Sequence, residues 1–189
     1  MTLDDMLKEP ENMIEGLFGS ILHGEPKELI NKFKTKKHNC IQLKDKYMGL
    51  AEPEFYLVWY ALTNSQKNIV IGAPKDLNAK AIFSTIKSQI AFAVRRINEI
   101  KENYISITAE GNDFIVLSNN VCISCGTLLD GCICARPYDL ILYISLDLMT
   151  DEQYAQFTKC YLPVILSNPE TKVIFVYEND NREIFKKLS

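Results

Sequence analysis

The sequence predicts an α/β fold in which a mostly parallel central sheet is flanked by helices and preceded by a short helical N-terminal segment. The chain has 189 residues, of which 47% are hydrophobic and 24% are charged, a composition typical of one folded domain. From residue 39 onward, short apolar runs alternate with helical stretches, which is typical of parallel strands joined by crossover helices. The runs at 139–144 and 172–177 are almost unbroken in apolar character, as strands buried on both faces require.

Residues 1–37 are expected to form the helical segment and residues 38–189 the α/β domain. In the segment, apolar residues recur at helical spacing on both sides of Pro10, which favours two short amphipathic helices. A third helix begins at Glu25 and Pro26. Behind its apolar face lies a basic run that consists of Lys32, Lys34, Lys36 and Lys37.

The first half of the domain predicts two strands, at 39–43 and 68–72, and two helices. Pro53 stands near the start of the first helix, where a missing N–H costs little, and residues 55–62 form its aromatic-rich body. The second helix extends from about residue 77 to residue 101 and carries most of its apolar residues on one side.

The second half begins with strands at 104–108 and 113–117, and the turn at 118–120 leads into a third strand through Val121 and Ile123. These three strands are expected to be antiparallel. A buried strand at 139–144 follows, and then a helix from Thr150, which is suited to an N-cap, to about residue 166. The last core strand is expected at 172–177, and a short amphipathic helix at 179–189.

Charge and hydropathy limit the function classes. Lys and Arg number 21 against 24 Asp and Glu, so the net charge of −3 provides no long-range attraction for nucleic acid. DNA binding would need a local patch, for which the basic run at 32–37 and the pair Arg95 and Arg96 are candidates; a solvated helix surface is the ordinary interpretation.

No apolar run approaches the roughly 20 residues of a membrane-spanning helix, and the N-terminus lacks the features of a secretory signal. We therefore expect a cytoplasmic protein without membrane contact.

Four of the six cysteines cluster, namely Cys122, Cys125, Cys132 and Cys134. Four thiolates are enough for a tetrahedral zinc site. However, a Cys-x-Cys half-site is less usual than Cys-x2-Cys, and a strand at 121–125 would point Cys122 and Cys125 to opposite faces. Buried thiols are therefore the preferred interpretation, with zinc or a redox role as alternatives, and no other cofactor is expected.

The remaining polar side chains predict no catalytic centre. His23 and His38 are the two histidines, and neither has a nucleophile or carboxylate at a recognisable catalytic spacing. The carboxylate pairs at 4–5 and 151–152 are suited to helix starts, where negative charge is favourable. A histidine-dependent hydrolase is therefore poorly supported.

Three segments carry a resemblance to a known family: ALTNSQKNIVIGAP at 61–74, LSNN at 117–120 and ARPYDLI at 135–141. With the order of elements over roughly residues 38–178, they resemble the ATPase domain of the large terminase subunit of tailed phages, the motor that pumps DNA into proheads. The resemblance implies a P-loop, RecA-type fold, a phage origin and a location in the host cytoplasm.

The chain departs from that family at the phosphate loop. The family's Arg-Gln-x-Gly-Lys-Thr/Ser loop wraps phosphates with backbone amides, its Lys reaches the terminal phosphates and its hydroxyl holds magnesium. In the matching segment Lys46 stands at the Arg position and Gly49 matches the glycine, but Leu50 replaces the Lys and Ala51 replaces the hydroxyl. Lys44, Lys46 and Gly49 would then belong to a vestigial loop.

A second departure concerns the Asp-Glu pair with which the family organises magnesium and activates water. Aligned from Asp139, these positions fall on Ile144 and Ser145, and Asp147 lies two residues further on, off the expected strand end. The polar coupling signal after the last strand is replaced by Val176 and Tyr177, and about a dozen residues follow where the family has a nuclease domain.

We therefore predict a catalytically inactive terminase-ATPase-like protein of phage origin that acts as a binding or regulatory protein. Its expected partner is a phage packaging or host protein, with DNA as a further candidate. The apolar stripe of residues 1–36 is the expected contact surface, because the family pattern has no match for it. The alternatives are a divergent DNA-packaging or helicase-like motor subunit completed in trans, and a zinc-stabilised DNA-binding module.

Overall fold

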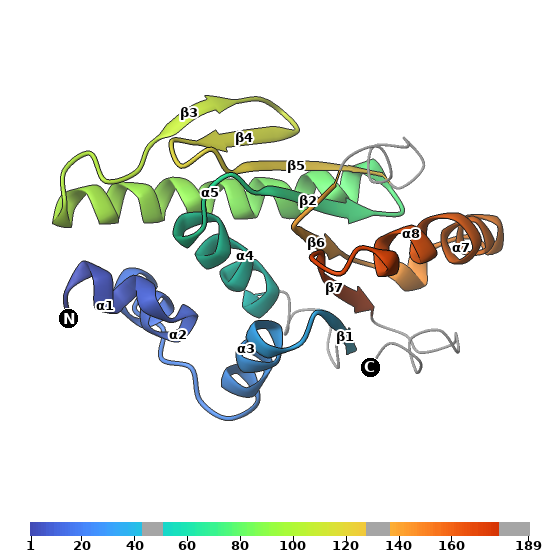
Figure 1. The fold of residues 1–189 in the computed structure, drawn as a ribbon, viewed down its shortest axis with the longest axis horizontal. Coiled ribbons are helices and arrows are strands. Elements are labelled where there is room, and N and C mark those ends of the chain that lie inside the picture. Colours follow the sequence, from blue (N-terminus) through green and yellow to red (C-terminus); the bar gives the residue numbers. More distant parts are fainter. Residues whose placement is uncertain (43–50, 128–136, 178–189) are drawn as a thin grey trace.

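Two helical layers enclose a central sheet in the computed structural model, which describes residues 1–42, 51–127 and 137–177 (Figure 1). Within these ranges the sheet has seven strands in the order β1-β7-β6-β2-β5-β4-β3. Their bounds are His38–Gln42 (β1), Asn68–Ala73 (β2), Ile107–Glu110 (β3), Phe114–Leu117 (β4), Cys122–Thr127 (β5), Leu140–Tyr143 (β6) and Lys172–Tyr177 (β7). The first five strands of that order run parallel, and β4 and β3 add an antiparallel hairpin. The predicted fold class is confirmed.

Successive residues of the parallel strands enter two different cores, because side chains alternate across a sheet. In β2, Ile69 and Ile71 pack with the N-terminal helices and with the helices at 51–63 and 76–100, whereas Val70 packs on the opposite side. The same alternation separates Leu140 from Ile141 in β6. Both faces of the sheet are therefore buried, which is why these strands are almost unbroken apolar runs in the sequence.

The first helical layer contains the N-terminal segment and the two helices that follow it. Its elements are α1 (Leu3–Lys8), α2 (Pro10–Met13), the π-helical turn η1 (Ile14–Phe18), α3 (Glu25–Thr35), α4 (Ala51–Thr63) and α5 (Asp76–Ile100). Thr2 caps α1 with a reciprocal capping box, and Pro10 occupies the first turn of α2, where no N–H partner is required. The predicted break at Pro10 is thus confirmed.

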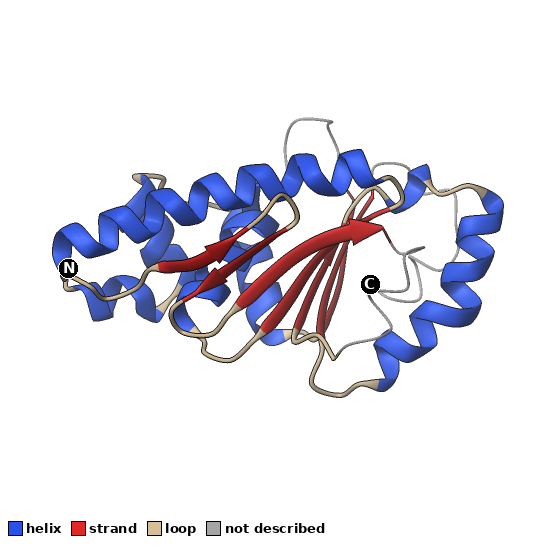
Figure 2. Ribbon diagram, turned by 90° about the horizontal axis from the view of Figure 1, so that it is seen from above, coloured by secondary structure: helices blue, strands red, loops and turns tan. Residues whose placement is uncertain are grey.

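The second helical layer covers the other face of the sheet and contains η3 (Leu146–Leu148), α7 (Asp151–Gln156), η4 (Phe157–Tyr161) and α8 (Leu162–Ser167). Figure 2 shows the sheet between α5 and this layer. Thr150 is the N-cap of α7, as predicted. The single helix predicted to residue 166 instead contains the π-helical turn η4, and Pro163, which lacks an N–H, stands at the start of α8.

Two other elements differ from expectation. The strand expected at 104–108 begins only at Ile107, because the Asn98 side chain accepts the Tyr104 N–H at 3.0 Å and donates to the Ile105 carbonyl at 2.7 Å. These hydrogen bonds tie the chain to the end of α5 instead of to β4. The helix predicted at 179–189 lies outside the described residues. Among the helices that the structure describes, none is long and apolar enough to cross a membrane.

Candidate functional site

The carboxyl ends of β1, β7, β6, β2 and β5 meet at one edge of the sheet, since these five strands are parallel. Ligands of open α/β sheets bind at this edge. The segment that matches the family's phosphate loop follows β1 here, and its residues Lys44, Lys46, Gly49 and Leu50 lie outside the described residues. The described part of this edge includes the first turn of α4 and the ends of β6 and β2.

The first turn of α4 carries two carboxyl groups, from Glu52 and Glu54. Glu54 is only 6% exposed, and its Oε2 accepts a hydrogen bond of 3.0 Å from Nε2 of Gln89 on α5. Burial raises the pKa of Glu54 to about 7. A helix N-terminus attracts anions, so it is the place where a phosphate would bind. In this chain, the carboxyl groups of Glu52 and Glu54 occupy that helix N-terminus.

The end of β6 carries no carboxylate at the two positions expected from the alignment. Ile144 is 3% exposed and its N–H donates to the Gly72 carbonyl at 2.9 Å, so it closes the strand as a core residue. Ser145 follows in the left-handed region, with φ of 56°, and turns the chain into η3. Asp147 lies within η3, past this turn. The backbone thus leaves the strand before it reaches Asp147.

Two of the matched segments, 117–120 and 135–141, each contain a polar side chain that links neighbouring elements. The Asn119 side chain donates to the carbonyls of Ala61 and Asn64 at 2.8 and 2.6 Å, which joins the β4–β5 turn to the end of α4. Asp139 accepts hydrogen bonds of 2.8 Å from Lys67 Nζ and from the Asn68 N–H, which aligns the starts of β6 and β2. These polar residues therefore position strands at the amino edge of the sheet.

No family model and no curated protein sequence matches the chain. The large terminase ATPase domain of Thermus phage P74-26 matches it in structure with a TM-score of 0.69 at 10% identity, over 95% of this chain and 73% of that one. A point mutant of the same domain gives a TM-score of 0.70 at 9% identity, with 95% and 74% coverage. The large terminase of bacteriophage HK97 gives 0.61 at 14% identity, over 97% of this chain and 39% of the terminase.

The chain has the fold of a terminase ATPase domain. The resemblance found in the sequence is therefore confirmed at the level of the fold, over nearly the whole chain. The identities of 9–14% carry no information about activity, so the chemistry of this terminase-like fold is argued from its own residues.

Two of the four clustered cysteines are described, and they lie on β5. Cys125 packs with the core beneath α5, whereas Cys122 stands at a register position that faces the other side of the sheet. Burial raises the pKa of Cys125 to about 11, which keeps this group a thiol at neutral pH. Cys132 and Cys134 lie outside the described residues, so the zinc site stays a prediction. No group of three metal-ligating side chains occurs within the three described ranges.

The structure does not gather the predicted basic residues into one patch. Arg95 and Arg96 are on α5, where Arg96 pairs with Glu99 at 2.7 Å and the Arg95 guanidinium lies 5.6 Å from the centre of the Phe92 ring. The lysines are on and after α3, on the far side of α4 (Figure 1). Lys34 pairs with Glu9, and Lys37 donates to the Pro169 carbonyl. Lys32 and Lys36 of this run line a cavity.

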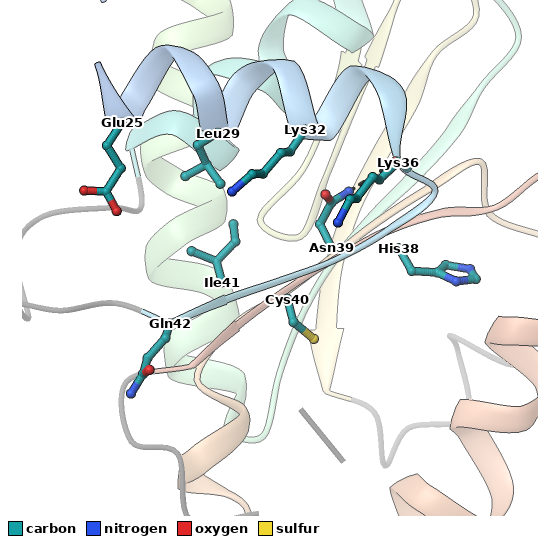
Figure 3. Close-up of a pocket in the computed structure, with 9 residues that line it drawn as sticks. All are labelled: Glu25, Leu29, Lys32, Lys36, His38, Asn39, Cys40, Ile41 and Gln42. Carbon is teal, nitrogen blue, oxygen red and sulfur yellow. Dashed lines mark hydrogen bonds between the residues drawn. The ribbon is translucent and has the colours of Figure 1, made fainter. Parts of the chain in front are cut away.

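That cavity of about 340 Å³ lies between α3 and the outer edge of β1, and sequence reasoning missed it (Figure 3). Positions 25, 29 and 32 of α3 and Lys36, which caps the end of that helix, form one wall, and residues 38–42 form the other. The helical spacing of positions 25, 29 and 32 can be recognised in the sequence. The position of β1 at the edge of the described sheet cannot, because it depends on the strand order.

Proposed function

We propose that this chain is a catalytically inactive, terminase-ATPase-like protein of phage origin that acts by binding a protein partner. One observation carries the proposal: a buried Ile144, followed by a turn at Ser145, stands where the family's strand presents its catalytic Asp-Glu pair. Magnesium-dependent phosphoryl transfer needs carboxylates at this place to organise the metal and the attacking water.

Two further features support the proposal. The sequence supplies Leu50 and Ala51 at the positions of the phosphate-binding Lys and the magnesium-binding hydroxyl. The first turn of α4 carries Glu52 and Glu54, which oppose an incoming phosphate by charge or occupy its space. The aligned positions of the phosphate-binding Lys, the magnesium-binding hydroxyl and the Asp-Glu pair thus all carry other residues, which supports the proposal of an inactive chain.

Titration of ATP with magnesium into the purified chain, followed by calorimetry, tests the proposal. We expect no saturable heat up to millimolar nucleotide and no phosphate release above the rate without protein. Phosphate release above that rate would contradict the proposal. Saturable micromolar binding without release would show that the nucleotide pocket survives, and Lys46→Ala would then show whether the old loop is responsible, with exposed Lys27→Ala as the matched control. Turnover that Ile144→Ala leaves unchanged would point to a contaminating enzyme.

A further inference from the structure

The cavity between α3 and β1 is a groove whose two walls run side by side. In Figure 3, Leu29, Lys32 and Lys36 extend from α3 toward β1, and Ile41 lies between the two elements. Ile41 is 8% exposed and gives the groove an apolar floor. The groove therefore offers apolar contact and the positive charge of Lys32 and Lys36, with the carboxylate of Glu25 at the start of α3.

Among the strands that the structure describes, β1 is the terminal one, so one side of its backbone has no neighbour among residues 1–42, 51–127 and 137–177. The Val173 N–H of β7 donates to the Lys37 carbonyl at 2.7 Å. Because hydrogen-bonding direction alternates along a parallel strand, Asn39 and Ile41 point their backbone groups inward to β7, and His38 and Cys40 point theirs outward. Within the described ranges no strand pairs with these outward groups.

An open edge of this kind is a template for another strand. An extended peptide that pairs with a sheet edge gains main-chain hydrogen bonds, and pockets on either side of the edge select its side chains. The outward N–H and C=O groups of His38 and Cys40 supply the first requirement, and the groove beside them supplies the second.

Charge indicates which extended segment fits. Lys32 and Lys36 are exposed, and neither forms an ion pair with any residue that the structure describes, in contrast to Lys34. Four helical residues advance by about 6 Å, and two strand residues by about 6.6 Å. Carboxylates two residues apart on a strand in the groove would therefore match the two ammonium groups.

We propose that this groove binds an extended, acidic segment of a partner protein, which adds to β1 as a strand and places two carboxylates against Lys32 and Lys36. The inference rests on the proposed binding function and deepens it, because it states the chemistry of the partner. Main-chain pairing at His38 and Cys40 provides the docking geometry, and the lysines select acidic sequences.

The probe is the capped peptide Thr-Val-Glu-Val-Glu-Val-Thr, titrated into the full chain labelled with nitrogen-15. We expect saturable shifts centred on the amides of His38 and Cys40, and slower hydrogen exchange of these two amides in the complex. The same peptide with Lys in place of Glu is expected to bind roughly tenfold more weakly or not at all.

Two matched pairs of variants separate main-chain pairing from charge. Cys40→Pro removes an outward N–H without breaking the β1–β7 ladder, since proline is tolerated at such an edge position, and we expect roughly tenfold weaker peptide binding. Cys40→Ala keeps the N–H and is expected to bind normally. Lys32→Glu with Lys36→Glu should weaken binding as strongly as Cys40→Pro, whereas Lys27→Glu, at an exposed position of α3 outside the groove, should not.

The proposal is overturned if the acidic peptide does not bind at millimolar concentration, or if the shifts lie away from β1. It is also overturned if Cys40→Pro is folded and binds as tightly as the unmodified chain. If Cys40→Pro does not fold, the variant with Lys32→Glu and Lys36→Glu still tests the proposal, which is overturned if that variant binds the acidic peptide as tightly as the unmodified chain. Duplex DNA that binds through Lys32 and Lys36 and is indifferent to Cys40→Pro would replace a protein partner with nucleic acid. None of these results bears on ATP binding, so the two proposals fail separately.

Discussion

At the scale of single residues, Glu54 is the most unusual group of the described site. It is almost fully buried in the first turn of α4, and it accepts a hydrogen bond from the Gln89 side chain. Burial disfavours the charged form and raises the pKa of Glu54 to about 7, while the nearby Glu52 acts in the same direction. Such a carboxyl group takes up a proton when the chain folds near neutral pH.

Glu54 therefore makes stability depend on pH. Its pKa in the folded chain lies above the ordinary value of 4.5, so the folded state binds more protons than the unfolded state between these values, and stability falls as pH rises. Between pH 5 and pH 8 we expect a loss on the order of 2 kcal/mol. Glu54→Gln should abolish this slope in urea unfolding experiments. The exposed Glu28→Gln is the control, and an unchanged slope in Glu54→Gln would refute the role of Glu54.

At the scale of elements, Lys172 connects three parts of the fold. From β7 its Nζ donates to the Phe33 and Lys34 carbonyls at 2.6 and 3.0 Å, and it contacts the Tyr56 hydroxyl of α4 at 3.1 Å. The two carbonyls belong to the last turns of α3, where helical carbonyls lack partners and positive charge is favourable. One ammonium group thus fixes the helix that forms a wall of the groove.

Lys172→Met tests this connection, because methionine keeps most of the side-chain length and removes the charge and the donors. We expect a loss of about 1–3 kcal/mol in the free energy of unfolding, together with faster hydrogen exchange at the end of α3. Lys159→Met, at an exposed position of η4, should change stability by less than about 0.5 kcal/mol. Equal effects of the two substitutions would mean that the contacts of Lys172 contribute nothing.

Most elements could be predicted from local patterns, since the buried strands are apolar runs and the helix starts carry Pro or Thr. The exceptions are not marked by a local pattern. The hydrogen bond between Asn98 and the Tyr104 N–H shifts the start of β3, and the π-helical turn η4 interrupts the predicted helix. The groove could not be predicted, because its existence depends on strand order, which no local pattern encodes. The absent Lys and Asp-Glu pair, by contrast, could be recognised by counting from matched motifs.

At the scale of the whole molecule, the N-terminal segment is part of the main core. Its apolar side chains at positions 3, 6, 7, 13, 14 and 17 are at most 7% exposed and share one cluster with α4 and α5. Phe18 packs against Phe55 and Phe92, with ring centres 4.9 and 5.4 Å apart, and Trp59 donates to the Leu7 carbonyl. The expectation that this apolar stripe is a free contact surface was therefore wrong, because the stripe is buried against the chain's own helices.

Leu17→Ala and Ile21→Ala separate core packing from surface contact within this segment. Leu17 is 3% exposed in the core, whereas Ile21 is 62% exposed. We expect Leu17→Ala to lower the free energy of unfolding by about 2–5 kcal/mol, because it removes buried methyl groups and leaves a cavity. Ile21→Ala should change it by less than about 0.5 kcal/mol. Chemical denaturation of both variants checks this, and a tolerant Leu17 would mean that the segment packs loosely. Because α3 belongs to the same segment, loose packing at Leu17 would also leave the wall of the groove less well fixed.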